Sequence, residues 1–127
     1  MKEEIYGDKK ALSILDKGQY NGIMWVIVSY GTHPCSYICI GDWNKLYGKK
    51  EEDLELDLDV HGGVTYTNND LWFNPESISD QWWFGWDYSH FNDYNSSCRI
   101  EGKKWTLDEL KKDVLKVCKK VHKYSKI

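Results

Sequence analysis

Two short stretches of the chain hold most of the side chains that could do chemistry. Residues 82–93 contain three tryptophans, two carboxylates and a histidine, and residues 61–66 read His-Gly-Gly-Val-Thr-Tyr. An Asp and a His at the end of an aromatic run need partners if the fold buries them, because a buried ionisable group is costly on its own. If the fold joins the two stretches, they form an aromatic-walled pocket that contains two imidazoles and a carboxylate.

We expect this pocket to bind a ligand, with His33 of the Thr-His-Pro turn folding back onto it. The predicted ligand-binding residues are His33, His61, Gly62, Gly63, Thr65, Tyr66, Trp83, Asp87, His90 and Asp93. If the protein is an enzyme, the predicted catalytic residues are His61, Thr65, Asp87 and His90.

A metal site is the first of three chemistries open to these residues. The spacing Asp87-x-x-His90-x-x-Asp93 places hard and borderline ligands in one loop. It matches no signature with a fixed mechanical reason, so the sequence predicts neither metal ligands nor a cofactor. Cys35 and Cys39 also fail as a metal pair, because four residues of a strand separate them by roughly 13 Å.

Acid–base catalysis on a phosphate ester is the second chemistry. His61 and His90 can serve as base and acid for attack by a neighbouring 2′-hydroxyl. Thr65 or glycine N–H groups would stabilise the phosphoryl oxygens, and Asp59 or Asp87 would fix the tautomers of the imidazoles. The substrate would be a cyclic nucleotide or another RNA-like diester.

Binding without turnover is the third chemistry. A nucleobase stacked on Trp or Tyr gains about 1–3 kcal/mol, the N–H groups of Gly62 and Gly63 can hold phosphate, and Asp87 can accept a hydrogen bond from a ribose hydroxyl. This alternative also explains the aromatic surplus of seven Trp and nine Tyr against three Phe. A purely structural alternative is that Asp87 and His90 form a buried pair that fixes their loop.

The composition limits the class of partner. A chain of 127 residues with a net charge of −3 is long enough for one domain, residues 1–127. Its basic residues are scattered or confined to the C-terminal segment, which argues against a duplex nucleic acid as partner. No run of about 20 apolar residues indicates a membrane span, and the N-terminus resembles no secretory signal. We therefore expect a cytoplasmic protein whose four cysteines are free thiols.

The elements that must position these residues are mostly strands. Apolar and β-branched runs predict strands over residues 22–30 and 36–40, and residues 42–53 are expected to be a solvated loop. Residues 9–17, ended by Gly18, predict a short helix.

Residues 54–61 show the cleanest alternation of apolar and polar side chains, which predicts a strand with Asp59 and His61 on one face. Gly62 and Gly63 then break or bulge that strand, allowing a close approach of a ligand or another backbone, and residues 64–67 continue it.

Residues 81–87 carry bulky side chains on both faces, which predicts a central strand. One face holds Trp82, Phe84 and Trp86, assigned to the core, and the other face holds Trp83, Gly85 and Asp87. Asp87 would thus emerge beside the small Gly85, where a ligand has room.

The C-terminal segment predicts an amphipathic helix. Thr106 and Glu109 form a capping box at its start, and the apolar stripe comprises Leu107, Leu110, Val114, Val117, Val121 and Tyr124. Strands followed by a terminal helix predict a small α+β domain with a mostly antiparallel sheet.

Several motifs together resemble a family of small proteins encoded by bacteriophages and mobile elements of Gram-positive bacteria. The motifs are residues 15–22, 29–38, 47–49, 60–66 and 83–90, followed by the Lys-Lys-Trp-Thr of residues 103–106. The resemblance covers almost the whole chain, and its most specific parts are the two motifs that combine glycine with histidine.

This resemblance implies an accessory role against host defence in the cytoplasm of an infected bacterium. Several bacterial defences signal through cyclic nucleotides or ADP-ribose derivatives. The preferred interpretation is that the protein sequesters such a signal, and the pockets of such proteins often lie between subunits, which favours a homo-oligomer. The alternatives are a phosphodiesterase that cleaves a cyclic dinucleotide and an inhibitor that binds a host protein.

Overall fold

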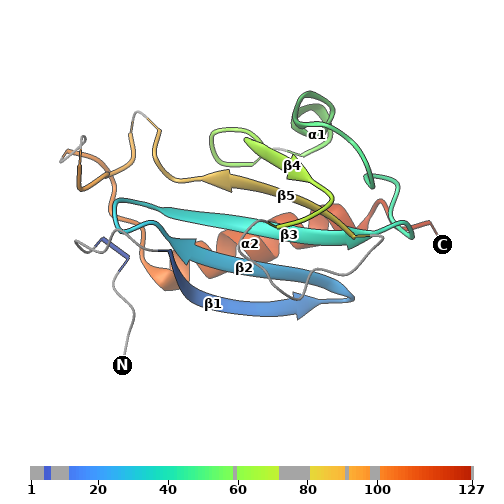
Figure 1. Ribbon diagram of the computed structural model, residues 1–127, viewed down its shortest axis with the longest axis horizontal. Helices are drawn as coiled ribbons and strands as arrows, with labels where there is room; N and C mark the ends of the chain where they lie inside the picture. Colours follow the sequence, from blue (N-terminus) through green and yellow to red (C-terminus); the bar gives the residue numbers. More distant parts are fainter. Residues whose placement is uncertain are drawn as a thin grey trace.

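A five-stranded antiparallel sheet packed against one long helix forms the fold (Figure 1). The computed structural model describes residues 5–6, 12–58, 60–71, 81–90, 92–97 and 101–126, without the side chains of residues 55–57. The strands are β1 Ser13–Tyr20, β2 Ile23–Ser29, β3 Pro34–Gly41, β4 Tyr66–Asn68 and β5 Gln81–Asp87, and the helices are α1 Glu51–Asp57 and α2 Leu107–His122. The spatial order of the strands is β1-β2-β3-β5-β4. The predicted α+β class with a C-terminal helix is confirmed.

The middle of the sheet follows the predicted strands closely. β2 and β3 pair from Met24 opposite Cys39 to Ser29 opposite Pro34, across the turn that the sequence places at residues 31–34. β5 lies between β3 and β4, so it is an interior strand, as its bulky residues on both faces predict. The last strand, β4, begins at Tyr66 rather than at residue 64.

The helix predicted at residues 9–17 is wrong from residue 13 onward, and residues 9–11 lie outside the described residues. Ser13–Tyr20 form β1, antiparallel to β2. The hairpin turns at Asn21 and Gly22, whose φ angles are +47° and +87°. An Asn-Gly pair in a two-residue loop matches the twist of two antiparallel strands, and backbone pairing with β2 outweighs the helical preference of the segment.

The strand predicted at residues 54–61 is also wrong. Glu51–Asp57 form α1, and the chain is extended only from Leu58. The carboxylates of Glu51, Glu52 and Asp53 occupy its first turn, where they interact favourably with the helix dipole. Leu54 and Leu58 are buried. Residues four positions apart share one face both in a helix and in a strand, so their spacing is compatible with either element.

Helix α2 covers one face of the sheet and creates the main core there (Figure 1). Thr106 accepts from the backbone N–H of Glu109, and the Glu109 side chain accepts from the N–H of Thr106, so the predicted capping box is present. The buried side chains of α2 meet Trp82, Phe84 and Trp86 of β5 in this core. In the described part of the chain, no helix has the length and apolarity needed to cross a bilayer.

The opposite face of the sheet carries a second, smaller core. It comprises Val26, Val28, Cys35, Tyr37, Cys39, Leu71 and Trp83, with Leu12, Tyr30 and Tyr66 packed against it. Side chains of β5 therefore divide between the two faces as the alternation predicts. Because Asp87 is the last residue of β5, it stands where the sheet gives way to the loops that carry the predicted site.

Candidate functional site

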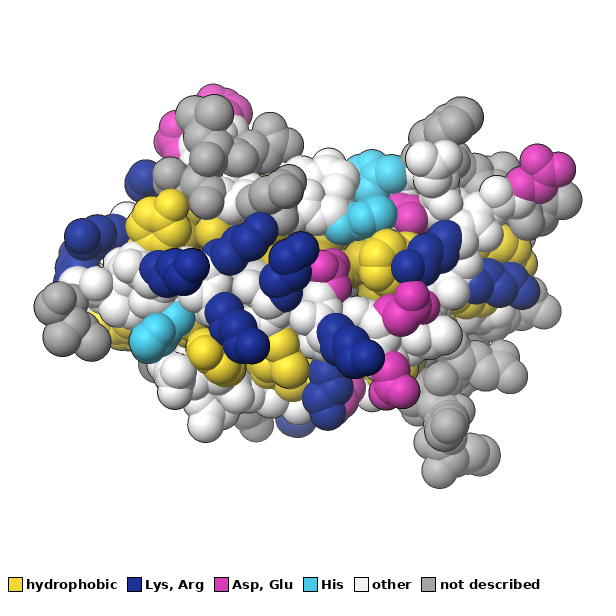
Figure 2. Space-filling model, turned by 180° about the vertical axis from the view of Figure 1, so that it is seen from behind, with side chains coloured by type: hydrophobic (Ala, Val, Ile, Leu, Met, Phe, Trp, Pro, Cys, Tyr) yellow, Lys and Arg dark blue, Asp and Glu magenta, His cyan; other side chains and the backbone are white. Residues whose placement is uncertain are grey.

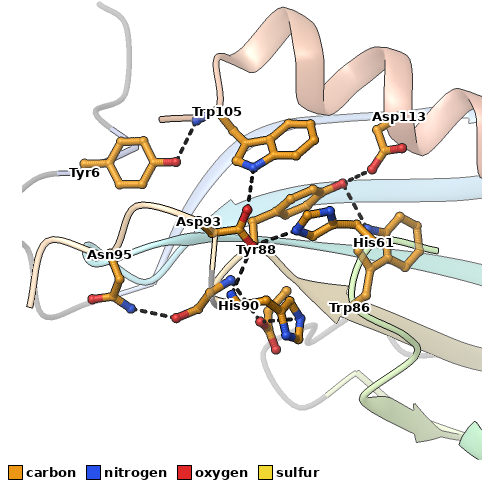
Figure 3. Close-up of polar contacts among 11 residues, drawn as sticks. Tyr6, His61, Trp86, Tyr88, His90, Asp93, Asn95, Trp105 and Asp113 are labelled. Carbon is orange, nitrogen blue, oxygen red and sulfur yellow. Dashed lines mark hydrogen bonds and ion pairs between the residues drawn. The ribbon is translucent and has the colours of Figure 1, made fainter. Parts of the chain in front are cut away.

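The two stretches that the sequence singles out do meet. His61, in the turn that follows α1, and His90, in the loop after β5, have ring centroids 5.6 Å apart and lie edge to face. Figure 3 shows the polar contacts around them, which draw in residues from the N-terminal segment, β5 and α2. We call the five side chains His61, Tyr88, His90, Asp93 and Trp105 the histidine network.

Asp93 is the centre of the histidine network. Its Oδ2 lies 2.6 Å from Nε2 of His61 and accepts from the backbone N–H of His90 at 3.0 Å, and its Oδ1 accepts from Nε1 of Trp105 at 2.9 Å. Its side chain is 2 % exposed. Burial raises the pKa of Asp93, but the three hydrogen bonds together lower it by more than burial raises it. The pKa therefore lies below its ordinary value of 3.8. The carboxyl is therefore ionised at neutral pH.

Asp93 orients the imidazole of His61. Because the ionised Asp93 can only accept, a neutral His61 carries its proton on Nε2 and leaves a lone pair on Nδ1. Hydrogen bonds from the described residues do not reach Nδ1. The orienting group is thus Asp93 rather than Asp87, and Asp59, the other predicted partner, lies outside the described residues.

Two aromatic side chains clamp the ring of His61. The ring of Tyr88 stacks on it, with centroids 4.8 Å apart and planes 17° apart, and Trp105 meets it edge to face at 5.1 Å. Tyr88 is fully buried; its hydroxyl accepts from Nε1 of Trp86 and donates to Asp113 of α2 (Figure 3). The imidazole is therefore fixed in position and direction from both sides.

His90 faces the neighbouring carboxylate of Asp87. Its Nε2 lies 3.3 Å from Oδ1 of Asp87, and its side chain is 36 % exposed. The ring rests on Gly62, whose φ is +68°, and a Cβ at that position would lie 2.0 Å from Nε2 of His90. Gly62 thus admits the His90 side chain, where the sequence predicts the approach of a ligand or another backbone. The N–H of Gly63 is used in a bond to the carbonyl of Val60 and is not free for phosphate.

A separate cavity of about 380 Å³ opens on the face of the sheet away from α2. We call it the tyrosine pocket; it is lined by Tyr30, His33, Cys35, Tyr37, Thr65, Tyr66, Trp86 and Asp87. Its volume falls in the range of small-molecule sites, about 300–1,000 Å³. Asp87 belongs to its wall and also contacts His90, so it links the pocket to the histidine network.

Strand register assembles the walls of the tyrosine pocket. Tyr37 of β3 and Tyr66 of β4 are both paired with Gly85 of β5, and their rings meet edge to face above it at 5.6 Å. A Cβ at residue 85 would lie 2.4 Å from the Tyr37 ring. The space that the sequence assigns to a ligand beside Gly85 is therefore filled by Tyr37, and the cavity lies next to that ring.

His33 is a neutral member of the pocket wall. Burial lowers its pKa below the ordinary 6.5, outweighing the opposite effect of Asp87. Its Nδ1 lies 2.8 Å from the Thr32 hydroxyl and 3.3 Å from the side-chain nitrogen of Asn95, and its ring lies against Tyr30. His33 thus folds back on the pocket, as the sequence analysis expects.

The predicted site residues divide between these two regions. His61, His90 and Asp93 meet in the histidine network, with Gly62 beneath His90, and His33, Thr65, Tyr66 and Asp87 line the pocket. Trp83 does neither: it is 3 % exposed within the second core. The sequence analysis missed Tyr30, Tyr37, Tyr88, Trp105 and Asp113. Tyr88 directly follows the predicted Asp87, and Tyr30 lies three positions before His33. Asp113 gives no signal because it falls among the charged residues of a helix.

The geometry does not support the metal alternative. Asp87 and His90 contact each other, whereas Asp93 is turned toward His61 and Trp105. Within the described residues, no group of three or more His, Cys, Asp or Glu side chains is placed to hold a metal ion.

Comparison with known proteins gives no match to a protein-family model, a curated protein or a solved structure.

Proposed function

We propose that this protein binds the nucleoside part of a nucleotide-derived signal in the tyrosine pocket and holds it out of solution. The observation that carries this proposal is the cavity itself, which joins three tyrosines, a histidine and a carboxylate on one face of the sheet. A few convergent polar groups in an aromatic cavity are typical of small-molecule sites.

The rings supply stacking surface for a base. Tyr37 and Tyr66 form a corner, and Tyr30 lies against His33 at 5.7 Å with planes 31° apart. Stacking of a base on such a ring contributes about 1–3 kcal/mol. The hydroxyls of Tyr30 and Tyr37 lie 2.7 Å apart, so the pair also offers a polar edge to the ligand.

Charge favours the nucleoside part over the phosphate. Asp87 is a carboxylate in the wall, and it can accept from ribose hydroxyls or from base N–H groups. His33, with its lowered pKa, brings no positive charge at neutral pH. A phosphate inside the pocket would therefore face a negative group, and it is better placed outside the cavity.

The biological role that we propose is capture of a cyclic nucleotide or an ADP-ribose derivative that serves as an immune signal. This role comes from the resemblance to small phage and mobile-element proteins described above. The pocket adds a physical reason, since a protein that binds a signal lowers the free concentration of that signal by binding alone.

Isothermal titration of the purified protein with cyclic mononucleotides, cyclic dinucleotides, ADP-ribose derivatives and the parent nucleosides tests the proposal. We expect a bound ligand that is recovered intact, by mass spectrometry, after the protein is denatured. Asp87→Asn should weaken binding about 10- to 100-fold, because a hydrogen bond to a charged group contributes about 1.5–3 kcal/mol.

Asp42→Asn is the matched control. Asp42 is exposed in the turn after β3, at the end of the sheet away from the pocket, and its substitution should leave affinity unchanged. No binding to any member of the panel would overturn the proposal and favour a protein-binding inhibitor of a host factor.

A further inference from the structure

We infer that the histidine network is an acid–base site that cleaves a phosphodiester next to a free ribose 2′-hydroxyl, with His61 as the base and His90 as the acid. The inference goes beyond ligand capture, because it assigns a reaction to side chains outside the tyrosine pocket. It rests on the geometry of the network and holds or fails independently of what the pocket binds.

His61 has the arrangement of a general base. Its Nε2 is hydrogen-bonded to the buried Asp93 at 2.6 Å, and its ring packs between Tyr88 and Trp105. Its side chain is nevertheless 28 % exposed, so a substrate can reach the ring. A carboxylate behind an imidazole keeps the correct tautomer and stabilises the imidazolium that forms when the other nitrogen takes a proton.

His90 is placed to act as the acid. It lies 5.6 Å from His61 between ring centroids, and its Nε2 is enclosed between Gly62 and Asp87. Because Nε2 is buried, the exposed part of the ring comprises its other atoms, and Nδ1 is the nitrogen that can exchange a proton with a bound substrate. Asp87 supplies the counter-charge of the protonated ring.

The surroundings of the two histidines suit a phosphate. Lys103 holds its ammonium 3.9 Å from the centroid of the Trp105 ring, which contacts His61, and it also pairs with Glu109 at 2.8 Å. Residues 103–126 carry nine lysines against three carboxylates. Figure 2 shows lysine side chains gathered over the α2 face, with histidine side chains at its border. Positive charge around a reactive group concentrates anionic substrates there.

The proposed reaction is an intramolecular transesterification. Nδ1 of His61 takes the proton of the 2′-hydroxyl, the 2′-oxygen forms a bond to phosphorus, and the bond from phosphorus to the 5′-oxygen breaks. The leaving 5′-oxygen takes a proton from Nδ1 of the protonated His90. The products are a 2′,3′-cyclic phosphate and a 5′-hydroxyl, and no water, metal or oxidant is consumed.

Asp93 acts as a positioning residue in this scheme. In Asp93→Asn the amide can donate to His61 Nε2, which then holds the proton on Nδ1 and removes the base. The variant also removes the negative charge that stabilises the imidazolium, so the acidic limb of the rate–pH profile should shift to lower pH or disappear. A merely structural role would lower activity without moving that limb.

A dinucleoside monophosphate with a 3′–5′ linkage and its 2′-deoxy analogue are the two probes. We expect chromatography and mass spectrometry to detect the 2′,3′-cyclic phosphate from the first and nothing from the second. His61→Gln and His90→Gln should each lower the rate about 10²- to 10⁴-fold, the usual contribution of an acid or base. His122→Gln, on the far end of α2, is the control and should retain the full rate.

His61→Gly distinguishes loss of the base from misfolding. If the imidazole ring is the base, added imidazole should restore turnover of this variant. Intact recovery of the ribose probe with the wild-type protein would overturn the inference while leaving binding in the tyrosine pocket untouched. Equal cleavage of the deoxy probe would also overturn it. Cleavage without nucleotide affinity in the pocket would support this inference and refute the proposed function.

Discussion

The histidine network and the tyrosine pocket differ in how their polar groups are satisfied. In the network, the buried carboxylate of Asp93 accepts from three donors, and the buried hydroxyl of Tyr88 bonds to two partners. In the pocket, Asp87 and the rings of Tyr37 and Tyr66 border a cavity. The network is held in one geometry, whereas the pocket offers polar groups and aromatic edges to another molecule.

The two regions also differ in their origin within the chain. The pocket follows from strand register, since Tyr37, Gly85 and Tyr66 face one another across three neighbouring strands. The network joins a turn, a loop and the segment before α2, which are far apart in sequence. Its geometry therefore depends on tertiary packing, and substitutions there should cost more stability than substitutions in the pocket.

The largest expected effect is that of Asp93→Ala. It leaves three donors without their acceptor, and each buried donor left unsatisfied costs about 1–3 kcal/mol. Urea unfolding followed by tryptophan fluorescence measures this. Asp42→Ala, at an exposed carboxylate, is the control and should change the free energy of unfolding by less than about 0.5 kcal/mol. A similar small change for Asp93→Ala would show that the network does not stabilise the fold.

Gly62→Ala should have the next largest effect. Gly62 and Gly48 both have positive φ, +68° and +82°, but a Cβ at residue 62 would meet the His90 ring at 2.0 Å and a Cβ at residue 48 would meet nothing. Gly62→Ala and the control Gly48→Ala share the backbone strain of a positive φ. The difference between their free energies of unfolding therefore isolates the clash with His90, which we expect to cost about 1–3 kcal/mol. Urea unfolding gives both values, and a shift of the His90 ring signals by NMR should accompany only Gly62→Ala.

The same substitution in each region tests the comparison directly. Tyr88→Phe removes a hydroxyl that serves Trp86 and Asp113, so we expect a loss of about 1–3 kcal/mol from the groups left unsatisfied. Tyr37→Phe removes a hydroxyl at the edge of the pocket, beside that of Tyr30, and should cost about 1 kcal/mol or less. Thermal unfolding of the two variants ranks them. Equal losses would contradict the distinction between the doubly bonded hydroxyl of Tyr88 and a hydroxyl at the edge of the pocket.

The smallest expected effect is a dependence of stability on pH. Because burial lowers the pKa of His33, the unfolded chain takes up a proton before the folded protein does. The free energy of unfolding should therefore be unaffected above pH 6.5 and should fall as the pH drops below it. The lowered pKa of Asp93 adds stability that is present above pH 3.8 and is lost as the pH falls further.

Urea unfolding at a series of pH values from neutral to about pH 3 measures both steps. His33→Gln should flatten the first decrease and leave the second. An unchanged first decrease in this variant would mean that His33 is not the group responsible.

The sequence predicted the parts of the fold that depend on local pattern. Residues 22–30, 36–40 and 81–87 form strands because their apolar and β-branched side chains suit a buried sheet, and Thr106 and Glu109 cap α2 as predicted. Residues 13–17 and 54–57 were assigned wrongly, because pairing with β2 and the dipole of a short helix outweighed the weak local preferences.

The sequence selected some residues of the candidate site but not their arrangement. His61, His90 and Asp93 were selected for their types, yet the partner of His61 was expected to be Asp59 or Asp87. Trp105 and Asp113 could not be found from sequence, since nothing local links a tryptophan before a helix or a helical carboxylate to loop residues 12 and 25 positions away.

The sequence by itself determined an α+β protein with a central aromatic strand, a capped C-terminal helix and two histidine-bearing motifs. Side-chain type, alternation and capping are local properties, and they act wherever the chain lies. Only the tertiary structure decided that the site residues divide between two faces of one sheet, with Asp93 buried against His61 and Asp87 in the wall of the pocket. That division depends on strand register and on the packing of α2, which are set by contacts between distant segments.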